Sequence, residues 1–117
     1  MAIERHRQGS TVVLALTGSF DAAAPEFAQT LLDAVREDDF DVILDLSRVA
    51  EFRATKPLLA AERQRRDQGG LRRLAIVAAP GTATFERLTF SGMGKQIPIF
   101  PTIDDVTGAW ETDGFPA

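Results

Sequence analysis

The chain has 117 residues, 44% of them hydrophobic and 26% charged, and its formal net charge at pH 7 is −4. This length suits one domain with a buried core, so we expect residues 1–117 to form a single domain. No apolar run approaches the roughly 18 to 20 residues that a membrane span needs, which argues against direct membrane insertion. The acidic balance also argues against general nucleic-acid binding, because contact with phosphates requires a basic surface.

Enzymatic chemistry has little support in the sequence. The chain has no cysteine and a single histidine, His6, which falls on a predicted edge strand where we expect it to face solvent. No phosphate-cradling glycine loop is visible, and neither is a set of metal ligands or of nucleophile, base and orienting residue. We therefore expect no enzyme activity, no catalytic residue, no metal and no cofactor. The N-terminal residues lack the apolar stretch of a secretory signal, so we place the protein in the cytoplasm.

The predicted strands are of two kinds. Residues 3–7 and 11–17, separated by a Gln-Gly-Ser turn, predict an N-terminal hairpin. The runs DVILDL at 41–46 and LAIVA at 74–78 are continuously apolar, which is typical of strands buried on both faces. A further short strand is expected at 96–100.

Helices are predicted between and after these strands. Residues 25–36 place apolar side chains at spacings of three and four, beginning with Phe27 and Leu31. A third helix is expected over 82–91, and Thr102 is expected to cap a short last helix with acidic residues in its first turn.

The second predicted helix needs a separate description. We expect it to begin with Thr55 as N-cap, to carry Pro57 in its first turn and to stop at the Gly-Gly pair of 69–70. Its apolar residues are confined to 58–61, so its C-terminal half has little to bury. The preceding residues 49–55, VAEFRAT, are predicted to be a strand-to-helix loop, a kind of segment that often carries function.

This order of elements predicts the fold class. Strands that alternate with helices pair in parallel through right-handed crossovers. The sequence therefore predicts an α/β fold with a mostly parallel sheet of about five strands, an N-terminal hairpin at its edge and four helices.

A basic segment, residues 53–73, stands out in this acidic chain. It contains two acidic residues, Glu62 and Asp67, and seven basic ones: Arg53, Lys56, Arg63, Arg65, Arg66, Arg72 and Arg73. The cations either solvate an exposed helix, favoured by the helix dipole near its C-terminus, or dock an acidic partner surface. The sequence alone leaves both readings open.

Several motifs in order resemble the STAS family, the sulfate-transporter and anti-sigma-factor-antagonist domains. GSFD at 18–21 is similar to the family's GELD, APEF at 24–27 to its APEL, and DVILDLSRV at 41–49 to its strand ending in DLSGV. RDQGGLRRLAIV, from residue 66, and LTFSGMGKQIPIFPTIDDV, from residue 88, are similar to the family's later segments. The resemblance covers nearly the whole chain and implies the STAS-like fold.

The resemblance also implies a site. In the family, a DSSG motif before the second helix carries a serine that is phosphorylated by a partner kinase, which is also the anti-sigma factor. Counted without a gap, that motif falls on Arg53, Ala54, Thr55 and Lys56, so the chain departs from it at every position and only Thr55 keeps a hydroxyl. Asp21 matches the GELD aspartate and is expected at the same end of the sheet.

The expected function is that of a non-catalytic regulatory module with a protein partner, in the manner of an anti-sigma factor antagonist. Its predicted contact residues lie in the loop and helix of 53–66 and beside them: Asp21, Arg53, Ala54, Thr55, Lys56 and Arg63. The partner suggested by the resemblance is an anti-sigma factor serine kinase. The module is either permanently competent or regulated by phosphorylation of Thr55. The alternative is an accessory or ligand-sensing subunit of a membrane transport system, and the oligomeric state is left open.

Overall fold

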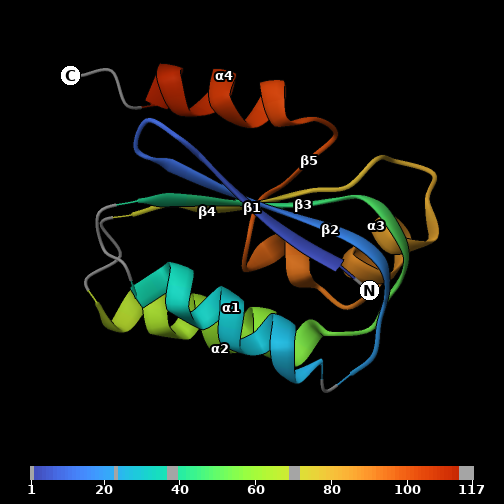
Figure 1. Cartoon of the computed structure of the whole chain (residues 1–117). Coiled ribbons are helices and arrows are strands. Elements are labelled where there is room, and N and C mark those ends of the chain that lie inside the picture. Colours follow the sequence, from blue (N-terminus) through green and yellow to red (C-terminus); the bar gives the residue numbers. More distant parts are fainter. Residues whose placement is uncertain (1, 23, 37–39, 69–71, 114–117) are drawn as a thin grey trace.

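The computed structural model describes residues 2–22, 24–36, 40–68 and 72–113 (Figure 1). Its elements follow the order β1 (Ala2–Gln8), β2 (Thr11–Phe20), α1 (Pro25–Arg36), β3 (Asp41–Phe52), α2 (Thr55–Asp67), β4 (Leu74–Val77), α3 (Ala83–Phe90), the 3-10 turn η1 (Met93–Lys95), β5 (Ile99–Phe100) and α4 (Ile103–Asp113). The five strands lie in the sheet in sequence order, with β1 antiparallel to β2 and the other neighbours parallel. This mixed α/β sheet with four helices confirms the predicted fold class.

The sheet buries two unequal cores. Alternate residues of β2, β3 and β4, such as Leu14, Leu44 and Ile76, pack against α1, α2 and α3 on one face. On the other face Ile43, Val77 and their neighbours pack against α4 alone. Figure 1 shows α1 and α2 on one side of the sheet and α4 on the other. The continuous apolar runs of β3 and β4 therefore fit strands covered on both faces.

β3 is longer than predicted. The segment 49–52, expected to be loop, continues the strand to Phe52, so only Arg53 and Ala54 connect β3 to α2. The reason is long-range pairing: after two register shifts β3 still follows β2, with Phe52 opposite Phe20.

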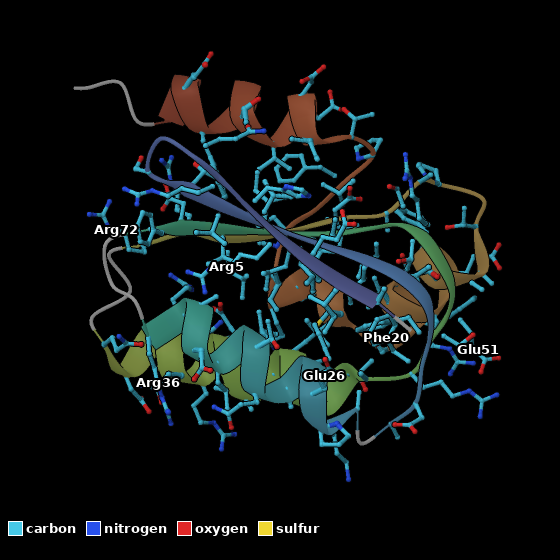
Figure 2. All side chains as sticks on the ribbon, in the orientation of Figure 1. Arg5, Phe20, Glu26, Arg36, Glu51 and Arg72 are labelled. Carbon is cyan, nitrogen blue, oxygen red and sulfur yellow. The ribbon has the colours of Figure 1, made fainter. Side chains whose placement is uncertain are left out.

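Three aromatic rings fix this end of β3. The rings of Phe20 and Phe52 lie 5.8 and 5.7 Å from the ring of Phe27 on α1, both in edge-to-face contact, and all three side chains are fully buried. Figure 2 shows Phe20 and Glu51 at one end of the sheet, and Arg36 and Arg72 at the opposite end.

The helix starts are partly as predicted. Thr82 and Thr102 accept hydrogen bonds from the backbone N–H groups of Phe85 and Asp105, at 3.2 and 3.1 Å, and cap α3 and α4. Thr55, however, is the first residue of α2 and not its N-cap. The N-cap is Ala54, and its methyl side chain makes no hydrogen bond to the helix. The glycines expected to stop α2 lie outside the described residues.

Candidate protein-binding site

The carboxyl ends of β2 and β3 bring two predicted site segments together. The N–H of Arg53 donates to the carbonyl oxygen of Phe20 at 2.9 Å, so the residues that follow the two strands are neighbours. Asp21 and Arg53 consequently lie at the same end of the sheet, the end at which parallel α/β sheets commonly place their binding groups.

Asp21 has a structural task in this arrangement. Its Oδ1 accepts a hydrogen bond from the N–H of Ala24 at 2.7 Å and holds the turn that leads into α1. Ala24 adopts a φ of 30°, an unusual conformation for a residue with a Cβ atom, and is buried. The carboxylate of Asp21 therefore fixes a strained turn while the residue itself stays exposed.

The residues predicted to fall on the family's phosphorylation motif differ in exposure and contacts. Ala54 is fully buried, so its methyl group does not lie on the surface where the predicted partner contact requires it. Thr55 is half-buried at the first turn of α2, and its N–H donates to the carbonyl oxygen of Arg53 at 3.0 Å. Arg53 is exposed and pairs with Glu51 at 3.2 Å, which compensates part of its charge.

The exposed side of α2 carries a compact set of side chains, called here the exposed α2 face: Lys56, Leu59, Ala60 and Arg63. These positions are spaced i, i+3, i+4 and i+7, so they form one stripe, and all four are exposed. Leu59 is one of two exposed large apolar residues among the described residues, at 44% exposure. No hydrogen bond or ion pair engages the side chains of Lys56 or Arg63 within the part of the chain that the structure describes.

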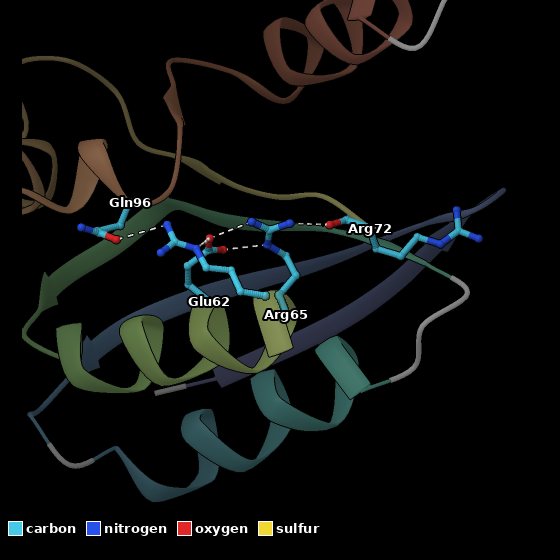
Figure 3. A network of polar contacts seen from close by, with 5 residues as sticks. Glu62, Arg65, Arg72 and Gln96 are labelled. Carbon is cyan, nitrogen blue, oxygen red and sulfur yellow. Dashed lines mark hydrogen bonds and ion pairs between the residues drawn. The ribbon is translucent and has the colours of Figure 1, made fainter. Parts of the chain in front are cut away.

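The other cations of α2, Arg65 and Arg66, bind a buried carboxylate of the same helix (Figure 3). Glu62 is 3% exposed, and its carboxylate binds Arg65 with two hydrogen bonds of 2.7 Å and Arg66 with one of 2.9 Å. Arg65 also donates to the carbonyl oxygen of Arg72 at 2.9 Å, and Arg66 to the side chain of Gln96 at 3.3 Å. We call these five residues the Glu62 cluster. It ties the C-terminal half of α2 to the start of β4 and to the residue after η1.

The charge of Glu62 depends on this pairing. Burial by itself raises the pKa of the carboxyl, but the hydrogen bonds and charges of Arg65 and then Arg66 outweigh it, so the pKa of Glu62 lies below its ordinary value. The bond to Glu62 likewise raises the pKa of Arg65. The half of α2 that has little apolar surface to bury is therefore anchored by a buried ionic cluster.

Further cations of the basic segment are also engaged elsewhere. Arg73 binds the carboxylate of Asp41 at 3.1 Å and lies 4.8 Å from the ring centre of Trp110. The seven cations of the basic segment thus lie in different environments. Those that remain available to a partner protein are Lys56 and Arg63 on the exposed α2 face, together with Arg53. Among the described residues, no group of three or more metal-ligating side chains is close enough to hold an ion.

An open groove of about 620 Å³ lies beside the start of α2. Arg53 and Thr55 line it on one side, and the exposed side of α3, which ends in Phe90, lines it on the other. Phe90 is 89% exposed. Sequence reasoning missed this residue, because Phe90 follows the apolar helix positions Phe85 and Leu88 without any pattern that marks it as exposed.

Comparison with known proteins agrees with this architecture. An anti-sigma factor antagonist from Mycobacterium paratuberculosis aligns with a TM-score of 0.78 at 23% identity, covering 92% of each chain. A putative anti-sigma factor antagonist from Thermotoga maritima gives a TM-score of 0.78 at 15% identity, again over 92% of each chain. The anti-sigma factor antagonist SpoIIAA in its unphosphorylated form gives 0.64 at 16% identity, over 97% of this chain and 100% of that one. The chain thus has the fold of the anti-sigma factor antagonists.

The family follows from the sequence match. The model described as "Mlab, STAS domain" matches residues 3–101. The chain belongs to this STAS family, as the motif resemblance indicated. No curated protein matches the chain in sequence. Within the described residues, none of the helices has the length and apolar character needed to span a membrane.

Proposed function

We propose that the protein is a non-catalytic regulatory interaction module, similar to an anti-sigma factor antagonist, which binds a protein partner in the cytoplasm through the exposed α2 face. Residues 1–117 act as one STAS-like domain in this proposal. The observation that carries it is the exposed side chain of Leu59 between two cations, Lys56 and Arg63, that have no partner among the described residues.

The composition of the face defines the chemistry of its partner. An apolar centre flanked by unpaired positive charges fits a surface with an apolar contact and acidic residues around it. The acidic chain as a whole repels such a surface, so the local cations orient the approach. A kinase of the anti-sigma factor type is the partner class that the resemblance suggests, with a role in signalling or transcription regulation.

The charges at the start of α2 support a binding role. Positive charge near a helix N-terminus opposes the helix dipole, and Arg53 and Lys56 flank this terminus. A residue that is unfavourable for the fold at an exposed position is expected where it serves an interaction.

Thr55 is the proposed control point. Its hydroxyl lies at the first residue of α2 on the rim of the groove, where a phosphate would meet the helix N-terminus and the cations Arg53 and Lys56. Phosphorylation there would add a charge of about −1.5 to −2, largely neutralise the site and release an acidic partner. Ala54 has no hydroxyl and is buried, so the usual position in the family cannot serve.

The test is an affinity purification of the tagged chain from its own cytosol with ATP, with partner identification and a phosphopeptide map over Thr55. Lys56→Glu and Arg63→Glu test the face singly and together. Arg48→Glu is the matched control for Arg63→Glu, because Arg48 is an exposed arginine of β3 that lies outside the exposed α2 face.

The proposal predicts a partner that the wild type and the control retain and that the variants of the α2 face lose. Phosphate on Thr55 would mean that the switch operates at this residue, and a partner without phosphate would mean a permanently competent module. Equal retention by all variants would contradict the proposed surface. Recovery in a membrane transport complex would contradict the regulatory role and support the transport alternative.

A further inference from the structure

The exposed side of α3 forms a second surface that is separate from the exposed α2 face. Ala83, Glu86, Arg87 and Phe90 stand at positions i, i+3, i+4 and i+7 of the helix, and all four are exposed and line the groove. We call them the α3 face. Leu88 points the other way and is fully buried in the core. The most exposed large apolar side chain of the described residues, Phe90, thus sits on a face that no other described residue covers.

The order of residues on the α3 face follows from helix geometry. At 100° per residue, Ala83 and Phe90 lie along the middle of the stripe, and Glu86 and Arg87 lie on opposite sides of it. The face therefore has a small and a large apolar residue on its midline, an acid on one flank and a base on the other.

This arrangement is complementary to itself. When a two-fold axis runs parallel to α3, each midline residue meets its own copy, and a residue on one flank meets the opposite flank of the copy. Glu86 then meets Arg87 of the second molecule on both sides of the axis, as flanking charges do in parallel helix pairs. Ala83 allows close approach, and the two Phe90 rings come together.

The exposed α2 face lacks this property. Lys56 and Arg63 stand at positions i and i+7 of that face, which are its midline, so the same two-fold axis would bring each cation against its own copy. The pattern of charge thus separates the two surfaces: the α2 face fits an acidic partner, and the α3 face fits itself.

We propose that a second copy of this chain docks on the α3 face and forms a symmetric dimer around Phe90 and the reciprocal Glu86–Arg87 pairs. α3 has eight residues, so the contact is small and the dimer is weak and dynamic. This inference goes beyond the proposed function and does not depend on it, because the two faces share no residue.

The first test is sedimentation velocity of the full chain from about 10 μM to about 1 mM. The wild type is expected to show concentration-dependent dimerisation, and Phe90→Ser to remain monomeric. Arg87→Glu places acids opposite each other and is expected to weaken the dimer about tenfold or more. The double variant Glu86→Arg with Arg87→Glu exchanges the flanks and is expected to restore it.

Leu59→Ser controls for the loss of any exposed apolar residue. It is expected to leave dimerisation unchanged, so a failure of this proposal is distinguishable from a failure of the proposed function. A wild type that is monomeric over the whole range would overturn the inference, and so would a charge exchange that gives no recovery. Circular dichroism checks that each variant is folded.

Cross-linking gives a second measurement that needs no change in the charges. The chain has no cysteine, so a single one can be introduced without background. Ala83→Cys on the midline is expected to form a disulfide-linked dimer under mild oxidation, because the axis brings the two copies within bonding distance. Ala60→Cys, the same substitution on the α2 face, is the matched control. Equal rates for the two variants would contradict the proposed axis.

Discussion

The two halves of α2 use the same kind of residue for different purposes. In the C-terminal half, Arg65 and Arg66 turn to the buried carboxylate of Glu62 and hold the helix on the protein. In the N-terminal half and on the outer side, Lys56 and Arg63 have no counter-charge within the described residues and flank the exposed Leu59. Positive charge in a sequence is therefore available to a partner only where no internal acid takes it up.

The largest expected effect comes from reversing the outer charges. Lys56→Glu combined with Arg63→Glu should weaken binding of the partner identified by affinity purification about hundredfold, because two attractive contacts become repulsive. Isothermal titration calorimetry measures the dissociation constant of the complex with the partner. The unfolding free energy should stay within about 1 kcal/mol of wild type, since both side chains are exposed. A large loss of stability would mean that these cations belong to the fold.

The complementary variant is Glu62→Gln, which removes the acid that the inner arginines share. Its unfolding free energy should fall by about 2 kcal/mol, because the arginines lose the negative charge and one of the two acceptor oxygens of a buried side chain, while Arg66 stays in contact with water. For a chain of this size the corresponding fall in Tm is about 8 °C. Denaturant unfolding measures the change, with Glu111→Gln, an exposed position, as the control. Unchanged stability would show that the cluster does not anchor α2.

The same cluster predicts a pH dependence. Because the folded-state pKa of Glu62 lies below its unfolded value of about 4.3, its contribution is fully present above that pH. The contribution is lost as pH falls through the folded-state pKa. The stability difference between wild type and Glu62→Gln should therefore shrink on acidification below about pH 4. A difference that stays constant from pH 7 to pH 3 would contradict this assignment.

The smallest expected effect is a stabilisation of the fold by a charge reversal. Lys56→Glu alone should raise the unfolding free energy by about 0.3–1 kcal/mol, because an acid in the first turn of α2 complements the helix dipole. The same substitution should weaken partner binding. Chemical denaturation and titration of one variant would then separate fold from function at a single residue. A destabilised Lys56→Glu would show that the lysine has a structural contact.

Much of the fold could be predicted from local patterns. The periodicity of residues 25–36 predicted the helix and its buried positions, and Thr102 was predicted as a cap because capping is a local interaction. The extension of β3 to Phe52 was not predicted. It depends on pairing with β2 and on the ring of Phe27, which are distant in sequence.

The role of the segment 53–66 as a binding site stays a prediction, but its exposed surface can be compared with the sequence. The segment 53–66 does carry the exposed α2 face, but net charge along the sequence concealed the pairing of Glu62 with the arginines three and four residues later. That spacing was a usable signal, because such pairs meet on one side of a helix. The burial of Ala54 and the exposure of Phe90 depend on the tertiary arrangement and had no local signal.

The most direct test of the central claim is the footprint of the partner on the chain by amide hydrogen exchange. The account predicts that binding slows exchange over residues 53–63 and leaves unchanged both β1, at the edge of the sheet, and α4, on the face opposite α2. Protection confined to β1 or α4, with none over 53–63, would contradict it.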